Sequence, residues 1–207
     1  DVAAAAVVLL GGDSHGHVAP HLDGASALSA SHRAARDLLE AAFRTRDRRA
    51  PRMLPVVGNH DTWPYFDHAA GRATREELAR VHNASLGATA AARFISTGCY
   101  SVRLASQPPL HVLALDTNAF ALSGADAAGS ARAQLRWLER ALSRVSAGGG
   151  AALLFGHIAP GASHVDFASM SPSGWVGGGW RAEHQASFAR LLQRHAASVV
   201  AGIFGHL

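Results

Sequence analysis

The chain has 207 residues, of which 48% are apolar and 16% are charged, and its formal net charge is +4. This length and apolar share fit one substantial core and exclude an intrinsically disordered chain. All 19 basic residues are arginines, and they are scattered without the block of like charges typical of a nucleic-acid-binding tail. We expect a single domain over residues 1–207 without a nucleic-acid-binding signature.

The cysteine count and the apolar runs restrict the class of protein further. Cys99 is the single cysteine, which excludes an intrachain disulfide and a cysteine metal cluster. The apolar runs fall short of the roughly 18 residues that a membrane span needs, so we expect no transmembrane segment. The densest basic cluster, Arg44 to Arg52, fits a solvated loop or a patch for an anionic partner. Oligomeric state stays open.

Two apolar runs in the first third of the chain end in polar turns. The run over residues 7–11 breaks into Gly12-Asp13, and the run over residues 53–57 breaks into Gly58-Asn59-His60-Asp61. Between them, residues 31–46 carry apolar side chains at helical spacing. Strand, helix and strand in this order predict two parallel strands whose polar turns meet at one edge of a sheet.

The middle of the chain is predicted to form a helix, two strands and a second helix, and a third helix is predicted nearer the C-terminal end. Residues 74–86 begin with a capping-box spacing and predict a helix. Two strand-like runs, 99–104 and 111–115, are separated by a Pro-rich break and predict a hairpin or two neighbouring strands. Residues 130–145 and 183–195 have the periodicity of amphipathic helices.

Two more apolar runs repeat the pattern of a strand followed by glycine and a polar residue. Residues 151–155 run into Gly156-His157, and residues 199–204 run into Gly205-His206. Each glycine permits a sharp turn that leaves the next side chain at the sheet edge. A lone His after a strand is usually exposed or satisfied locally, but four strand ends in agreement predict a metal site rich in N and O donors.

The order of these motifs resembles the calcineurin-like metallophosphoesterases, and finer features resemble the acid sphingomyelinase-like phosphodiesterase branch. The resemblance implies an α/β fold with central β-sheet layers flanked by helices. The matching stretches are Gly12-Asp13 with His17, Gly58-Asn59-His60-Asp61-Thr62-Trp63-Pro64, Tyr100-Ser101-Val102, Leu115-Asp116-Thr117-Asn118, Gln134-Leu135-Arg136-Trp137-Leu138-Glu139 and Gly156-His157-Ile158-Ala159-Pro160-Gly161.

The resemblance implies a site with two divalent metal ions, with zinc as the expected metal. Asp13 looks like the carboxylate that bridges the two ions, and Asn59, His157 and His206 look like the other ligands of the second ion. The implied reaction is hydrolysis of a phosphodiester, of lipid or nucleotide type, by a metal-activated water. A phosphomonoesterase and a degenerate metal-binding pseudoenzyme are the alternatives.

Two histidines are implied on the substrate side of this site. His60 would lie beside the scissile phosphate, where it stabilises charge or protonates the leaving oxygen. His17 resembles a second such histidine, and His15 is the competing candidate. The family also suggests a secreted or lysosome-like compartment.

The chain departs from the family at both ends. The family begins with a strand ending in Asp-x-His, which is absent before Val7, and it continues beyond His206 to a further histidine. Asp13 is therefore the one expected protein ligand of the first metal, whereas the second metal has all four. We expect a fragment of a larger enzyme rather than a degenerate domain, because both losses fall at the ends.

The remaining histidines lack the setting of a glycine at a strand end, and we expect surface or core roles for them. These are His21, His32, His68, His82, His111, His164, His184 and His195. Trp175 and Trp180 lie in a long segment rich in Gly, Ser and Pro over residues 158–180, typical of a functional loop. They fit the lining of a substrate cleft or packing within the loop equally well.

Overall fold

A computed structural model describes residues 7–14, 24–43, 50–63, 71–122, 125–161 and 179–206 of the chain. The strands are β1 (Val7–Leu10), β2 (Arg52–Pro55), β3 (Tyr100–Ser106), β4 (Pro109–Ala114), β5 (Ala151–Ile158) and β6 (Val199–Gly205). The helices are α1 (Gly24–Ala42), α2 (Gly71–Val81), α3 (Asn83–Leu86), α4 (Ala88–Thr97), α5 (Asn118–Ala121), α6 (Ala125–Ala147) and α7 (Ala182–Arg194), and a 3₁₀ turn spans Ala196–Ser198. The predicted α/β fold class is confirmed.

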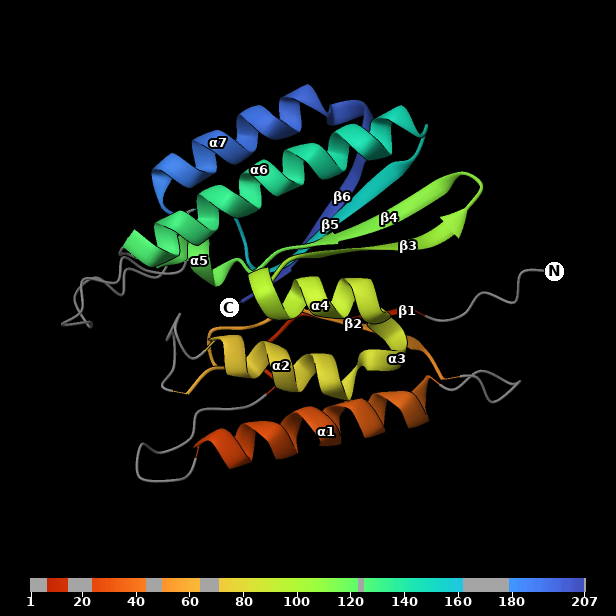
Figure 1. Ribbon diagram of the computed structural model, residues 1–207, viewed down its shortest axis with the longest axis vertical. Coiled ribbons are helices and arrows are strands. Elements are labelled where there is room, and N and C mark those ends of the chain that lie inside the picture. Colours follow the sequence, from red (N-terminus) through yellow and green to blue (C-terminus); the bar gives the residue numbers. More distant parts are fainter. Residues whose placement is uncertain are drawn as a thin grey trace.

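The strands form two sheets that face each other (Figure 1). β1 and β2 make a parallel pair, and the backbone N–H of Val56 extends the pairing by donating to the Leu10 carbonyl at 3.0 Å. The second sheet has the order β3-β4-β5-β6, with an antiparallel β3–β4 hairpin and parallel pairs beyond it. Of the two arrangements predicted for residues 99–115, the structure has the hairpin.

Several helices differ from the predicted ones. α1 begins at Gly24, seven residues before the predicted start, because the Ala-rich segment before Ser31 favours helix without showing a periodic apolar face. The predicted helix over residues 74–86 is two helices, α2 and α3, and α4 was not predicted at all. Alanine-rich α4 carries few charges to mark a polar face, yet it buries Phe94 completely.

Two apolar cores lie on opposite faces of the four-stranded sheet. α6 and α7 cover one face, where Leu138, Leu142 and Leu154 are buried (Figure 1). α4 and the β1–β2 pair cover the other, where Phe94 and Phe155 are buried. No helix in the described part of the chain combines the length and apolarity that crossing a bilayer requires. The single domain predicted for residues 1–207 stays a prediction.

Side chains of β3 and α5 hold the β1–β2 pair in place. The Tyr100 hydroxyl donates to the carbonyl of Pro55 at 2.8 Å, and the Asn118 amide donates to the carbonyl of Gly58 at 3.2 Å. Tyr100 is fully buried and Asn118 is nearly so. Because each side chain bonds the backbone around the end of β2, the two sheets are fixed relative to each other beside the turn at residues 58–61.

We expect Tyr100→Phe to lower the free energy of unfolding by about 1 to 2 kcal/mol, because the buried Pro55 carbonyl loses its donor while the ring packing is kept. Urea denaturation followed by circular dichroism measures the change. Ser101→Ala removes an exposed hydroxyl from the neighbouring residue and should change stability by less than about 0.5 kcal/mol. Equal effects of the two substitutions would contradict the role of the Tyr100 bond.

Candidate metal centre

The turn after β1 places Asp13 against the turn after β2. Gly12 has φ 86° and Asp13 has φ 51°, so two successive residues adopt the left-handed region. A Cβ on Gly58 would lie 2.1 Å from Asp13 Oδ1, so only glycine permits this approach. The prediction that glycine makes each of the four turns is wrong in detail: His206 itself has φ 63°, and Gly156 lies inside β5.

The carboxylate of Asp61 ties these two turns together. It accepts the backbone N–H groups of Asp13 at 2.8 Å, Ser14 at 3.1 Å and Gly58 at 2.8 Å. His32 Nε2 lies 3.0 Å from the same carboxylate, and both side chains are buried. Asp61 therefore compensates the strained backbone of Asp13 with hydrogen bonds that no other described side chain supplies.

Thr117 sets the position of His157 within β5. Its Oγ1 accepts the backbone N–H groups of His157 at 3.0 Å and Ile158 at 2.7 Å. A Cβ on Gly156 would lie 2.5 Å from the Thr117 methyl group, so this glycine is required by close packing. His157 was expected just after a strand, but it lies inside β5, which continues to Ile158.

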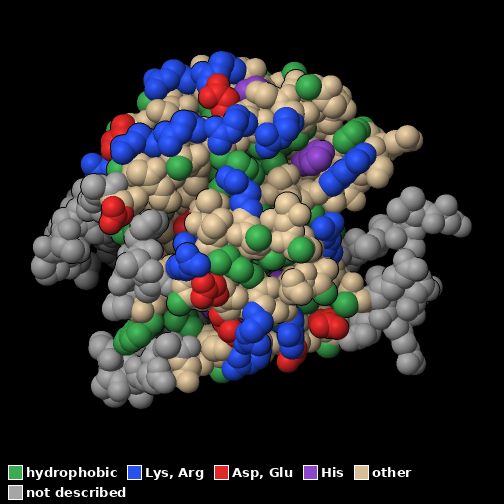
Figure 2. Space-filling view, in the orientation of Figure 1, with side chains coloured by type: hydrophobic (Ala, Val, Ile, Leu, Met, Phe, Trp, Pro, Cys, Tyr) green, Lys and Arg blue, Asp and Glu red, His purple; other side chains and the backbone are tan. Residues whose placement is uncertain are grey.

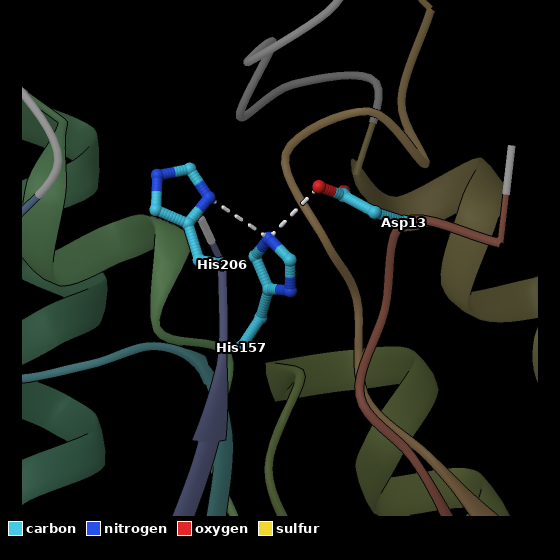
Figure 3. A group of neighbouring side chains, drawn as sticks. All are labelled: Asp13, His157 and His206. Atoms are coloured by element: carbon cyan, nitrogen blue, oxygen red, sulfur yellow. Dashed lines mark hydrogen bonds and ion pairs between the residues drawn. The ribbon is translucent and has the colours of Figure 1, made fainter. Parts of the chain in front are cut away.

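The side chains of Asp13, Asn59 and His206 converge at the imidazole of His157, and Figure 3 shows Asp13 and His206 on either side of it. Nδ1 lies 2.6 Å from the carbonyl of Gly11, which can only accept, so Nδ1 carries a proton. Nε2 lies 2.9 Å from Asn59 Oδ1, 3.2 Å from Asp13 Oδ2 and 3.2 Å from His206 Nδ1. A histidine that donates one ring N–H to a carbonyl and turns the other nitrogen toward oxygen and nitrogen donors has the arrangement of a metal ligand.

These donors suit a divalent cation. The ligand atoms of Asp13, His157 and His206 lie within 4.8 Å of one another, and they form the one such group of three or more His, Cys, Asp or Glu among the described residues. Metal bonds to N and O are about 2.0 to 2.2 Å, so two ligands of one ion lie at most about 4.4 Å apart. The 3.2 Å distances from His157 Nε2 to Asp13 Oδ2 and to His206 Nδ1 fall within this limit. Imidazole, carboxylate and amide donors without thiolate fit zinc and similar first-row ions.

The charges within the group favour an ionised Asp13. Burial alone would raise the pKa of Asp13, but the hydrogen bond and charge of His157 hold that pKa below its ordinary value. Burial alone would lower the pKa of His157, yet Asp13 raises it. Burial lowers the pKa of His206, and the charge of His157 lowers it further. A proton and a metal ion therefore compete for Nε2 of His157.

His60 lies beside this group without belonging to it. Its backbone N–H donates to Asp13 Oδ1 at 2.8 Å, and its side chain is half-buried. A charge on His60 contributes to lowering the pKa of Asp13 and of His206. The two other predicted substrate-side candidates, His17 and His15, lie outside the described residues, as does Trp175.

Several residues that support the centre were not assigned by the sequence analysis. His32 was expected in a surface or core role, and it is buried against Asp61, but its position on α1 carries no local signal of that pairing. Thr117 and Asn118 follow β4 as the predicted donors follow their strands. No glycine precedes them, so the pattern of glycine and polar residue does not include them. Trp180 is buried and donates to the Ile158 carbonyl at 2.8 Å, so it packs rather than lines a cleft.

We expect Asp61→Asn to lower the free energy of unfolding by about 3 kcal/mol and to weaken zinc binding, because an amide NH₂ would face backbone donors in a buried site. Urea denaturation and zinc titration measure the two effects. Asp37→Asn, which neutralises an exposed carboxylate on α1, is the matched control. An Asp61→Asn protein as stable as the control would contradict the role given to Asp61.

His82 makes stability depend on pH. Burial lowers its pKa to about 4, and the charges of His32 and Arg36 act in the same direction. Its pKa in an unfolded chain is about 6.5, so its contribution to stability is complete above that pH and is lost as the pH falls toward 4. We expect a loss of about 3 kcal/mol from this group.

The free energy of unfolding, measured by urea denaturation between pH 7.5 and pH 4, tests this expectation. His82→Leu should reduce the pH dependence. A His82→Leu protein with the original pH dependence would refute the assignment.

Comparison with known proteins gives one distant similarity. No family model matches the chain. Over 157 residues it is 22% identical to a protein of Dictyostelium discoideum named sphingomyelinase phosphodiesterase D. The match covers 74% of this chain and 33% of that protein, so the chain spans about a third of the length of the relative. The chain is thus distantly similar to a protein named as a phosphodiesterase, and its own structure contains a candidate metal-binding triad.

Proposed function

We propose that this chain is a metal-dependent phosphodiester hydrolase of the sphingomyelinase-like type. The observation that carries the proposal is the approach of Asp13, Asn59 and His206 to within 3.2 Å of His157 Nε2, with Nδ1 bonded to a backbone carbonyl. The similarity to a protein named a phosphodiesterase supports the reaction class, and its name supports a phosphodiester lipid as the substrate.

Asp13, Asn59, His157 and His206 would hold a divalent ion, for which zinc is the proposed identity. When bound, such an ion supplies a Lewis acid that stabilises charge on phosphate oxygens and an activated water for attack on phosphorus. The protein's part is to keep the four donors together before the ion arrives. Bonds from Gly11 to His157 and from Asp61 to the Asp13 turn do this, so little reorganisation is needed on binding.

His60 is proposed as the acid that serves the leaving oxygen. Its backbone N–H donates to Asp13 Oδ1, so the carboxylate proposed to hold the ion also fixes the position of the His60 backbone. The residue is half-buried, so part of its surface is open to solvent. Hydrolysis of a phosphate ester expels an alkoxide, which benefits from a positioned proton donor. The name of the similar protein supports a diester rather than a monoester.

A metal-binding protein without turnover is the second candidate. The described residues gather donors for one ion, and the other oxygen of Asp13, which would have to reach a second ion, accepts the His60 N–H at 2.8 Å. The two-metal site therefore stays a prediction. Catalysis by the proposed mechanism requires either further donors that complete the second metal site or a reaction that proceeds with one ion.

Zinc content and hydrolysis test the proposal together. We expect the chelator-stripped chain to bind zinc and then to hydrolyse bis-p-nitrophenyl phosphate faster than p-nitrophenyl phosphate, with sphingomyelin as the lipid substrate to compare. His157→Ala should lose both zinc and activity. His60→Ala should keep zinc but lose activity about 100-fold or more, because it removes a general acid. His195→Ala, at the end of α7 and outside the group of proposed donors, is the control.

Each outcome separates the candidates. Zinc binding without hydrolysis, both in the chain and in a longer chain that includes the flanking encoded sequence, would support the metal-binding protein and refute the enzyme. Faster hydrolysis of the monoester would support a phosphomonoesterase. Zinc content unchanged by His157→Ala would refute the metal centre itself.

A further inference from the structure

A pocket lined by arginines lies between β3, the start of α4 and the second half of α6. Its volume is about 620 Å³, within the range of small-molecule sites. None of the proposed metal donors lines it. The five arginines that do are Arg52, Arg93, Arg103, Arg140 and Arg144.

The positive charge of this pocket is not neutralised by neighbouring acids. No Asp or Glu lines it, and none of the five arginines pairs with a carboxylate of the described residues. Arg52 instead donates to the carbonyls of Ser85 at 2.8 Å and Arg103 at 2.9 Å, and Arg103 donates to two carbonyls of its own hairpin. These bonds orient the guanidinium groups and leave their charge available.

The other three arginines of the pocket are Arg93, Arg140 and Arg144. The Arg93 guanidinium lies over the ring of Trp137, 4.9 Å from its centre, and Trp137 is 5% exposed. A cation–π contact holds the side chain without removing its charge. Arg140 and Arg144 are exposed on successive turns of α6, along which Figure 2 shows a row of basic side chains.

The N-terminus of α4 opens on the same pocket. Gly87 precedes the helix with φ 74° and provides no side-chain cap, and it lines the pocket together with Ala88, Thr89 and Ala90. The first N–H groups of a helix have no partner within it and attract anions. Protection of the open edge of β3 would account for Arg103 alone. It does not account for the stacked Arg93 or for arginines on α6.

We propose that this pocket binds a phosphate group, carried by a small phosphorylated molecule or by a lipid headgroup. Guanidinium forks match pairs of phosphate oxygens, and a phosphomonoester has enough charge and acceptors to engage several of them at once. Five like charges gathered without counterions repel one another, and a bound phosphate offsets that repulsion. The site is separate from the proposed catalytic residues and requires no metal.

Calorimetric titration of the chelator-stripped protein with inorganic pyrophosphate tests the site. The double variant Arg140→Gln/Arg144→Gln should bind pyrophosphate at least tenfold more weakly. Arg132→Gln/Arg136→Gln removes two exposed arginines with the same spacing from the same helix, outside the pocket, and should change the affinity less than twofold. His157→Ala should bind pyrophosphate as the original chain does, so this result is independent of the proposed hydrolase.

Vesicles identify the source of the phosphate. Co-sedimentation with phosphatidylcholine vesicles containing phosphatidic acid, lost in Arg140→Gln/Arg144→Gln but kept in Arg132→Gln/Arg136→Gln, would identify a lipid headgroup. Pyrophosphate binding without co-sedimentation would identify a soluble ligand. Equal weakening in both double variants, or no binding of pyrophosphate by the original chain, would overturn the proposal.

Discussion

The carboxylate of Asp61 is the group on which the arrangement of the candidate centre depends. It accepts three backbone N–H groups from the turns after β1 and β2, and it lies against the buried ring of His32. Without these bonds, Asp13 would have no compensation for its left-handed backbone. Because the two turns carry Asp13 and Asn59, one buried side chain determines where two of the four proposed donors lie.

The other two donors come from the larger sheet, so the contact between the sheets decides whether the four meet. Tyr100 and Asn118 bond the backbone around the end of β2, and Thr117 bonds the backbone of His157. The Gly11 carbonyl then receives His157 Nδ1–H across the same boundary. Packing in the core and hydrogen bonds at the sheet edge thus fix the same arrangement of the four proposed donors. A metal ion would then be bound without large rearrangement.

Charge is distributed differently in the two proposed sites. The metal centre combines a carboxylate, an amide and two imidazoles, a set suited to a cation. The pocket between α4 and α6 gathers five arginines that pair with no carboxylate among the described residues, a set suited to an anion.

Local patterns in the sequence determined the α/β class, most strands and the four proposed donors, because each strand end carries its own apolar run and polar turn within a few residues. Tertiary structure alone decided that these strand ends meet. It also decided that His32 pairs with Asp61, 29 residues away, and that Thr117 accepts the backbone N–H of His157. It also placed α4, whose alanines show little periodicity. The physical reason is that buried hydrogen bonds and cores join residues distant in the chain, and no local spacing records such partners.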